Sequence, residues 1–314
     1  MMQLKTLAQA VAFFQNEDAC HKLYEQMRFP DGVVVCPKCG QRGAYNYATT
    51  RAYKCKSKTC KAKFSITVGT VLENTKLPLG KWFTALYLIS AHKKGISSLQ
   101  LARDLGIGNK AAWFMLQRLR EMLQDNAPEW LDTFVECDEV YVGGKWKNRS
   151  QSKRKERKER KEAGYISDDT KTPVLGMLQR DGKAILKVMD GTTEETMKGI
   201  IRENVSPESV IITDSHTSYV GLDKEFAGHE VVNHSQGEYV RGDIFTNSVE
   251  GFFSHLKRMI FGTYHSVSRK HLARYCNECS YRYNTRKIKD GERFALLLAN
   301  TNGRLKYKDL IKKS

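Results

Sequence analysis

Three acidic side chains in the second half of the chain come from three different predicted elements. Asp138 lies in the strand "FVECDEVYVGG", Asp214 ends the strand "SVIITD", and Glu250 lies on the helix "TNSVEGFFSHLKRMIFG". Carboxylates gathered at one place repel one another unless a cation lies between them. Hard oxygen ligands suit Mg²⁺, and two such ions can activate a water or hydroxyl and stabilise the oxygen that leaves phosphorus. The acids therefore indicate divalent-metal phosphodiester chemistry, although acids also cap helices and end strands for purely structural reasons.

The elements that position these acids follow one another as a strand, a hairpin of two strands, a helix, another strand and a long helix. The hairpin turns at Asp181-Gly182, between "TPVLGMLQR" and "KAILKVMDG", and the helix after it is "TEETMKGIIREN". On the long helix, Glu250 and Lys257 lie together, about 90° from the centre of an apolar face. That face consists of Val249, Phe252, Phe253, Leu256 and Ile260. A stiff, buried strand holds Asp214 within the tolerance that metal geometry demands.

Two further acids, Glu136 and Glu139, flank Asp138. Side chains alternate along a strand, so Glu139 is expected on the face opposite Asp138. Glu136 shares the face of Asp138 but lies about 7 Å along the strand. Neither is therefore expected to replace Asp138 at the same metal.

Four of the eight cysteines form two clusters, "CPKC" at 36–39 and "CKSKTC" at 55–60. The clusters are separated by 15 residues and the first is followed by Gly40, a pattern typical of a zinc ribbon. We expect one structural zinc ion, held by Cys36, Cys39, Cys55 and Cys60. The remaining cysteines are predicted to be core residues: Cys20, Cys137, Cys276 and Cys279.

Helical periodicity follows the cysteine region, and three helices fit it. In "LQLARDLGIGNKAAWFML", Ala102 lies four residues before Gly106, a spacing typical of a helix-turn-helix. The second helix, from about Asn109 to Leu123, is predicted to bury Trp113, Leu116 and Leu119. It is expected to expose four residues to DNA: Asn109, Lys110, Arg118 and Arg120. A plain helical hairpin between two domains is the alternative.

The charge of the chain points to a polyanionic partner such as nucleic acid. The net charge is +17 with a pI near 9.4, and residues 145–162 hold ten Lys or Arg against three Glu. This run is predicted to be a mobile loop or a solvated helix that orders on phosphates through residues such as Lys153, Arg154 and Lys155. A merely solvated loop is the alternative. Because the chain contains no run of about 18 apolar residues, we expect a cytoplasmic protein without membrane contact.

Together these motifs resemble the zinc-ribbon DDE transposases of bacterial insertion sequences, the ISXO2-like group. The resemblance covers nearly the whole chain, in the family's order, through "RFPDGVVVCPKCG", "FSITVGTVLENTKLPLGKWF", "VECDEVYVGGK", "VIITDSHTSY" and residues 246–286. It implies a catalytic triad of Asp138, Asp214 and Glu250, with 35 residues between the last two. It also implies that Lys257 contacts substrate DNA.

This sequence departs from the family pattern at two positions. Phe245 stands where His is expected, and Phe253 stands where Trp is expected. Neither position is a triad acid. Some related elements use asparagine as the third ligand, so Asn247 remains a lesser candidate.

The resemblance further implies the fold, the chemistry and the partners. The fold is an RNase H-like catalytic domain with a mixed five-stranded sheet, holding two Mg²⁺ or Mn²⁺ ions. Water attacks the phosphodiester at each transposon end, and the freed 3′ hydroxyl attacks target DNA in line. The partners are double-stranded DNA, both ends and target, and further copies of the chain in a homodimer or larger assembly, associated with the bacterial nucleoid.

The expected organisation is an α/β chain with five parts. They are an N-terminal helical segment (1–34), a zinc ribbon (35–76), a helix-turn-helix (77–126), the RNase H-like domain (127–288) with a basic insertion (145–170), and a C-terminal tail (289–314). Two rival functions remain open. One is a metal-dependent nuclease or resolvase that cuts without joining, and the other is an inactive transposase-derived DNA-binding regulator.

Overall fold

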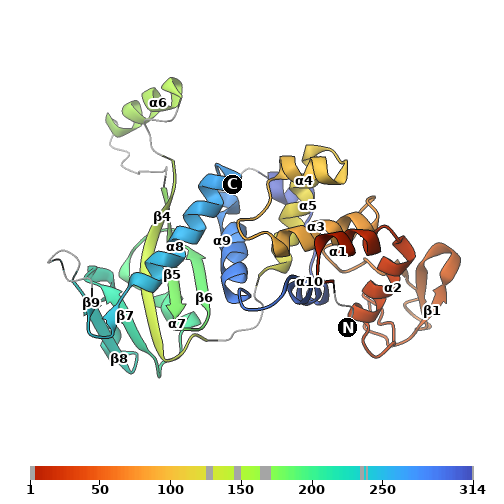
Figure 1. Ribbon diagram of the computed structural model, residues 1–314, viewed down its shortest axis with the longest axis horizontal. Coiled ribbons are helices and arrows are strands. Elements are labelled where there is room, and N and C mark those ends of the chain that lie inside the picture. Colours follow the sequence, from red (N-terminus) through yellow and green to blue (C-terminus); the bar gives the residue numbers. More distant parts are fainter. Residues whose placement is uncertain are drawn as a thin grey trace. The chain divides into compact units, whose positions relative to one another are not determined.

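The computed structural model describes residues 4–124, 130–144, 150–162, 171–233, 237 and 240–312. The chain forms two compact units (Figure 1). One consists of Met1–Gln124 with Thr285–Ser314, and the other is Asp125–Asn284. No helix in the described part of the chain is long and apolar enough to cross a membrane.

The first unit begins with two helices and a small antiparallel sheet that carries the clustered cysteines. Both helices start at a capping side chain: Thr6 accepts from the N–H of Gln9, and Asn16 accepts from the N–H of Ala19. The sheet has the order β1-β2-β3. The elements are α1 (Leu7–Phe14), α2 (Glu17–Arg28), β1 (Ala44–Tyr47), the 3₁₀ turn η1 (Ala48–Thr50), β2 (Ala52–Cys55) and β3 (Lys63–Ser65).

Three helices follow, as the periodicity predicted: α3 (Leu79–Ala91), α4 (Ser98–Leu105) and α5 (Asn109–Met122). Ser97 caps α4 by accepting from the N–H of Gln100. The helix ends at Gly106, whose φ of 58° is left-handed and favours glycine. The predicted turn between α4 and α5 is therefore present at this glycine.

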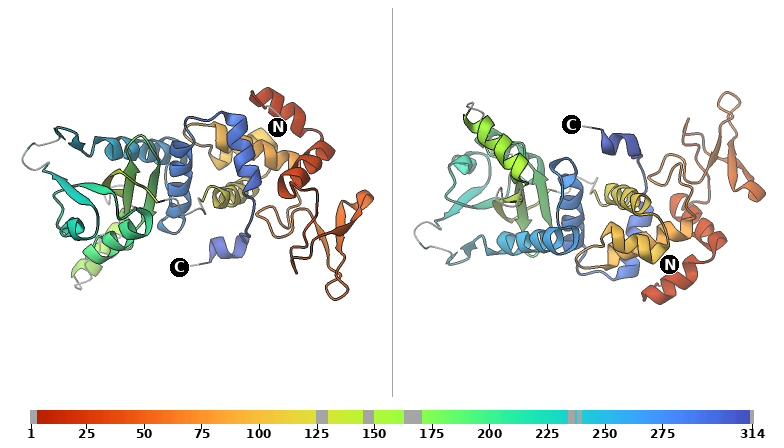
Figure 2. Two further views of the ribbon diagram at one scale, coloured as in Figure 1. Left: turned by 90° about the horizontal axis from the view of Figure 1, so that it is seen from below. Right: turned by 90° about the horizontal axis from the view of Figure 1, so that it is seen from above.

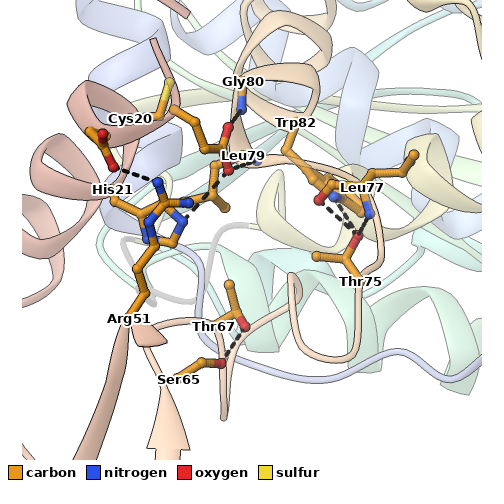
Figure 3. A network of polar contacts seen from close by, with 12 residues as sticks. Cys20, His21, Arg51, Ser65, Thr67, Thr75, Leu77, Leu79, Gly80 and Trp82 are labelled. Carbon is orange, nitrogen blue, oxygen red and sulfur yellow. Dashed lines mark hydrogen bonds and ion pairs between the residues drawn. The ribbon is translucent and has the colours of Figure 1, made fainter. Parts of the chain in front are cut away.

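Polar contacts fasten α2 to the ribbon sheet and to the start of α3 (Figure 3). The carboxylate of Glu17 accepts the N–H groups of Leu79 (2.8 Å) and Gly80 (3.0 Å). Arg51, at the end of η1, pairs with Asp18. The small sheet is thus held to the helical part of its own unit by charges on α2.

The C-terminal residues return to the first unit. They form α10 (Asp290–Ala299) and the short α11 (Tyr307–Ile311). Phe294 on α10 is 3% exposed and packs against Phe14 and Phe83, with ring centroids 5.2 and 5.9 Å apart. The segment expected to be a tail is therefore part of a hydrophobic core, because α10 supplies an aromatic side chain to it.

The second unit is built on the predicted mixed five-stranded sheet, in the order β6-β5-β4-β7-β8. Strand β4 pairs antiparallel with β5 and parallel with β7, and β7 pairs parallel with β8. The predicted hairpin joins β5 and β6, with Asp181 in the turn at a φ of 54°. The strands are β4 (Phe134–Gly143), β5 (Lys171–Gln179), β6 (Ala184–Val188), β7 (Val210–Asp214) and β8 (Gly228–Val232).

Helices cover both faces of this sheet (Figure 2). Side chains of α8 and α9 pack with Val140 and Val174 on one face, and side chains of α7 pack with Cys137 and Ile211 on the other. The remaining elements are α6 (Gln151–Glu162), α7 (Glu194–Asn204), the turns η3 (Thr217–Tyr219) and η4 (Leu222–Lys224), β9 (Val240–Arg241), β10 (Ile244–Phe245), α8 (Asn247–Met259), the π-helical turn Ile260–Tyr264 and α9 (Arg269–Asn284).

Helix α8 packs closely on the sheet at Gly176. This glycine is the cross-strand partner of Asp138. A Cβ added at Gly176 would lie 2.4 Å from Cε1 and 2.7 Å from Cζ of Phe253, and 3.2 Å from Cγ2 of Val249. The missing side chain therefore lets the ring of Phe253 rest directly against β5.

We predict that Gly176→Ala lowers the free energy of unfolding by about 1–3 kcal/mol, because the rigid ring of Phe253 must move and take α8 with it. Urea unfolding of the full chain measures the change. Gly199→Ala on α7 is the matched control, since a Cβ there meets nothing within 4 Å. That control should gain about 0.5–1 kcal/mol, as alanine does inside a helix. Equal effects of the two substitutions would contradict the close contact.

Candidate functional site

Asp138 and Asp214 come from adjacent parallel strands and face the same side of the sheet. The register pairs Glu136 of β4 with Ile212 of β7, so two residues farther along each strand Asp138 and Asp214 lie level. On the same two strands, Cys137 and Ile211 pack against α7. Because side chains alternate along a strand, Asp138 and Asp214 project to the opposite face, where α8 lies. Both carboxylates are half-buried. Parallel pairing thus brings together two acids that are 76 positions apart in the sequence (214 − 138).

Glu250 joins these acids from α8. Its neighbours Val249 and Phe252 are buried in the core under α8, while Glu250 itself is exposed. Burial, together with the negative charges of Glu139, Asp214 and Glu250, raises the pKa of Asp138 to about 7, against the opposing effect of the hydrogen bond from the N–H of Glu139. Asp138 therefore lies within electrostatic reach of both other predicted triad acids.

The donor chemistry of this site fits a hard divalent cation, because three carboxylates offer only oxygen ligands. A second candidate metal site of different chemistry lies in the ribbon, where the sulfur atoms of the four clustered cysteines all lie within 4.8 Å of one another.

The turn after β7 holds the Asp214 carboxylate in place. Its Oδ1 accepts the backbone N–H of His216 at 3.0 Å. The His216 ring accepts the N–H of Ser218 and lies edge-on to Tyr219, with centroids 6.1 Å apart. The residues "SHTSY" thus fix the side chain that ends the strand.

Glu139 lies on the far face, as strand alternation predicted. The Tyr219 hydroxyl donates to its Oε2 at 2.9 Å. Glu136 shares the face of Asp138 and has a role that the sequence reasoning missed. Its fully buried carboxylate accepts the N–H groups of Ser248 and Val249 at the start of α8. A third acid in the same strand as Asp138 and Glu139 was the available indication of such a contact.

The four clustered cysteines suit a single zinc ion. The sulfur atoms of Cys36 and Cys60 are 3.9 Å apart, and those of Cys39 and Cys55 are 3.6 Å apart. Zn–S bonds of about 2.3 Å in a tetrahedron place the sulfurs about 3.8 Å apart. The geometry therefore fits the predicted ligand set. The other four cysteines, Cys20, Cys137, Cys276 and Cys279, are buried, as predicted.

The outer face of the ribbon sheet, which we call the ribbon face, combines aromatic and basic side chains. Tyr45 and Tyr47 on β1 are 56% and 43% exposed. Lys54 stands opposite Tyr45 and Lys63 stands opposite Lys54, while Nζ of Lys56 lies 5.5 Å from the Tyr45 ring centroid. Both tyrosines are functional candidates that the sequence motifs do not include, and their spacing of two along a strand was the signal for a shared face.

Helix α5 requires a correction to the predicted DNA contacts. Arg118 is 4% exposed and Arg120 is 1% exposed, so the prediction that both face DNA is wrong. Nη2 of Arg118 donates to the carbonyl of Glu73 at 2.7 Å, and the guanidinium lies 5.0 Å from the Trp82 ring centroid. Burial lowers the pKa of Arg118 to about 10. An isolated helical wheel could not show these neighbours, which come from elements before α4.

The first turn of α5 remains accessible. Asn109 and Lys110 are exposed, as predicted. Nζ of Lys110 lies 4.9 Å from the ring centroid of Tyr307, and the same ring packs edge-on against Trp113, which is half-buried and not fully buried as expected. The C-terminal segment therefore covers one side of this helix.

The predicted basic contacts of the second unit lie on helices. The basic run forms α6 over Gln151–Glu162, on which Arg154 and Lys155 are exposed. Lys153 is part of α6, but its side chain is outside the described residues, as are residues 145–149 and 163–170. Lys257 is exposed on α8, two turns after Glu250.

We predict that Asp138→Asn stabilises the Mg²⁺-free protein. A carboxyl group whose folded-state pKa is raised from 3.8 to about 7 makes the fold lose stability as the pH rises through this range. Asparagine removes that loss, so the free energy of unfolding at pH 8 should rise by roughly 1–4 kcal/mol, and by less at pH 5. Urea unfolding at both pH values measures the change. Asp223→Asn, at an exposed position on η4, is the control and should change nothing. The same gain at both pH values would rule out the raised pKa.

We also predict that Cys39→Ser, or removal of zinc, unfolds the ribbon, because a segment of this size has too little core without its metal. Zinc content and amide hydrogen exchange over residues 33–66 report the loss, while exchange in the second unit should stay unchanged. Lys38→Ser, between the two cysteines of the first pair, should keep both zinc and protection. Full protection of the ribbon after complete zinc removal would refute the prediction.

Two family descriptions match the chain. The ISXO2-like transposase domain matches residues 130–284, which span the five-stranded sheet, and the transposase zinc-ribbon domain matches residues 15–63. No solved structure matches the chain.

Two curated relatives are also similar to it. A protein described as uncharacterised in transposable element ISH50, from Halobacterium salinarum, is 30% identical over 282 residues, which cover 88% of this chain and 91% of the relative. An uncharacterised transposase-like protein from Haemophilus influenzae is 31% identical over 107 residues, which cover 34% of this chain and 85% of that protein. The chain therefore belongs to the ISXO2-like family of insertion-sequence transposases.

Proposed function

We propose that this protein is a DDE transposase that binds the terminal inverted repeats of an insertion sequence, cleaves phosphodiesters at its ends and joins the 3′ hydroxyls to target DNA. The observation that carries the proposal is the level placement of Asp138 and Asp214 on adjacent parallel strands, with Glu250 on the helix over the same face. In a member of a transposase family, this arrangement suits the metal-dependent reaction of an RNase H-like domain.

In this proposal the three carboxylates hold the metal ions, and basic side chains hold the DNA. Bound Mg²⁺ or Mn²⁺ would supply Lewis acidity to the attacking and leaving oxygens. A bound cation would favour the ionised form of Asp138, because its positive charge would offset the burial and the neighbouring negative charges that raise this pKa. Lys257, on the same side of α8 as Glu250, contacts a phosphate of the substrate strand.

DNA recognition is assigned to surfaces on both units. In the first unit these surfaces are the ribbon face, stabilised by zinc, and the first turn of α5, where Asn109 and Lys110 are exposed. Helix α5 would be the second helix of a helix-turn-helix. In the second unit α6 neutralises backbone phosphates through Arg154 and Lys155. Lysines beside exposed tyrosines combine charge with a stacking surface. A homodimer or larger assembly in the bacterial cytoplasm would pair two transposon ends.

We expect Asp138→Asn, Asp214→Asn and Glu250→Gln each to reduce cleavage and joining by more than about 100-fold, beyond the loss usual for residues that only support metal ligands. Binding of the terminal repeats should survive, because the substitutions are nearly isosteric. Glu139→Gln is the matched control, because the Glu139 carboxylate lies on the far face with Tyr219. This substitution should reduce cleavage and joining by less than the three others. The assay incubates purified protein with Mg²⁺ and labelled DNA that carries the flanking repeats, and maps cut and joined products.

The same assay separates the rival functions. Cleavage without joined products would indicate a nuclease or resolvase, and repeat binding without cleavage would indicate a regulator. Normal cutting and joining by Asp214→Asn would overturn the three-carboxylate assignment.

A further inference from the structure

Glu136 is a fully buried acid that the proposed reaction does not use. Its side chain is 0% exposed, two residues before Asp138 on the same face of β4. One carboxylate oxygen, Oε2, accepts the N–H groups of Ser248 (2.9 Å) and Val249 (3.0 Å). The other, Oε1, accepts from Nε of Arg180 at 3.0 Å. Every one of these contacts joins β4 to the chain immediately before Glu250 or to Arg180.

The contacts to Ser248 and Val249 lie at the N-terminus of α8. These N–H groups belong to the first turn, where a helix has no internal acceptors, and a carboxylate there also interacts favourably with the helix dipole. The side chain of the N-cap residue, Thr246, makes no capping hydrogen bond. A distant strand thus supplies the cap that a local residue usually provides.

Arg180 extends the same contact to the segment before α8. Its guanidinium donates to the carbonyls of Asp243 and Phe245. It also lies 4.0 Å from the ring centroid of Phe245, the position where the family pattern has His. Arg180 therefore balances the buried charge of Glu136 and holds the residues before Thr246, while Glu136 holds the residues after it.

A role in stability alone does not account for this arrangement. Buried ion pairs often add no more stability than apolar side chains of the same volume, and their best-attested use is to specify one geometry. Val249 directly precedes Glu250, and Glu136 lies on the strand that carries Asp138. The Glu136–α8 hydrogen bonds are therefore a direct link between the elements that carry two of the three proposed metal ligands.

We propose that Glu136 and Arg180 form a positioning clamp that fixes the start of α8 on β4 and so sets the separation of the Glu250 and Asp138 carboxylates. The clamp touches neither metal nor DNA. This inference rests on the proposed function, because it assigns the clamp to the same three-carboxylate site.

The test measures Mn²⁺ binding to the zinc-loaded full chain by calorimetry, with Mn²⁺ alone as the probe. Glu136→Gln keeps the shape of the side chain but removes the charge and one accepting oxygen. It should weaken Mn²⁺ binding by about 10–100-fold, the range for residues that support metal ligands. Amide hydrogen exchange at Ser248 and Val249 should also become faster.

The matched control is Glu278→Gln on α9. Glu278 is equally buried at 0% exposed, pairs with Arg282 at 2.6 Å and accepts from the hydroxyl of Tyr264 at 2.6 Å. These two partners lie on α9 and in the π-helical turn Ile260–Tyr264 and not at the start of α8. It should lose similar stability in urea unfolding while Mn²⁺ affinity and exchange at Ser248 stay within about twofold of the parent chain. Arg180→Lys, which keeps the positive charge but not the planar fork, should fold and give an intermediate Mn²⁺ affinity.

The outcomes separate the clamp from the proposed function. Unchanged Mn²⁺ affinity in both Glu136→Gln and Arg180→Lys, or an equal loss in Glu278→Gln, would overturn the clamp while leaving the triad in place. Mn²⁺ binding that is insensitive to Asp214→Asn would overturn the three-carboxylate site, and the clamp with it.

Discussion

The parallel pairing of β4 with β7 is the constraint on which the candidate site depends. It places Asp138 and Asp214 level on one face, although two helices, α6 and α7, and two strands separate them in the sequence. A parallel pair requires a crossover connection, and here β5, β6 and α7 supply it. The same crossover buries the far face of the sheet under α7, so the two acids can meet only on the side of α8.

The position of α8 is the second constraint, and it is set by packing and by charge. Gly176, opposite Asp138, removes a Cβ that would collide with Phe253. Glu136 accepts two N–H groups of the first turn and holds that end of the helix. The result is a cluster of acids in which burial, together with the neighbouring negative charges, raises the pKa of Asp138 to about 7, a cost that a bound cation would relieve. Such a cost is typical of a site arranged for binding rather than for stability.

The first unit shows how strongly tertiary contacts alter the meaning of a basic side chain. Arg118 lies in the interior, where its guanidinium donates to a backbone carbonyl and lies near the ring of Trp82. Lys110, which precedes it by eight residues on the same helix, stays accessible. Arginine tolerates such sites because its planar, weakly hydrated charge can stack on aromatic rings and donate in several directions. Accessible basic side chains lie on the ribbon face and on the first turn of α5, and the ribbon face also exposes two tyrosines.

The sequence by itself determined the elements whose signals are local. These include the β-branched strand that ends in Asp214, the hairpin at Asp181, the α4–α5 turn at Gly106 and the paired cysteines, because periodicity, turn chemistry and ligand spacing act over a few residues. The mixed five-stranded sheet and the family followed from the resemblance of whole motifs. Only the tertiary structure decided that Arg118 and Arg120 are buried, that Phe294 brings the C-terminal segment into the first unit, and that Glu136 caps α8. Each of these depends on contacts between residues far apart in the chain, and no local pattern encodes which distant surface a side chain will meet.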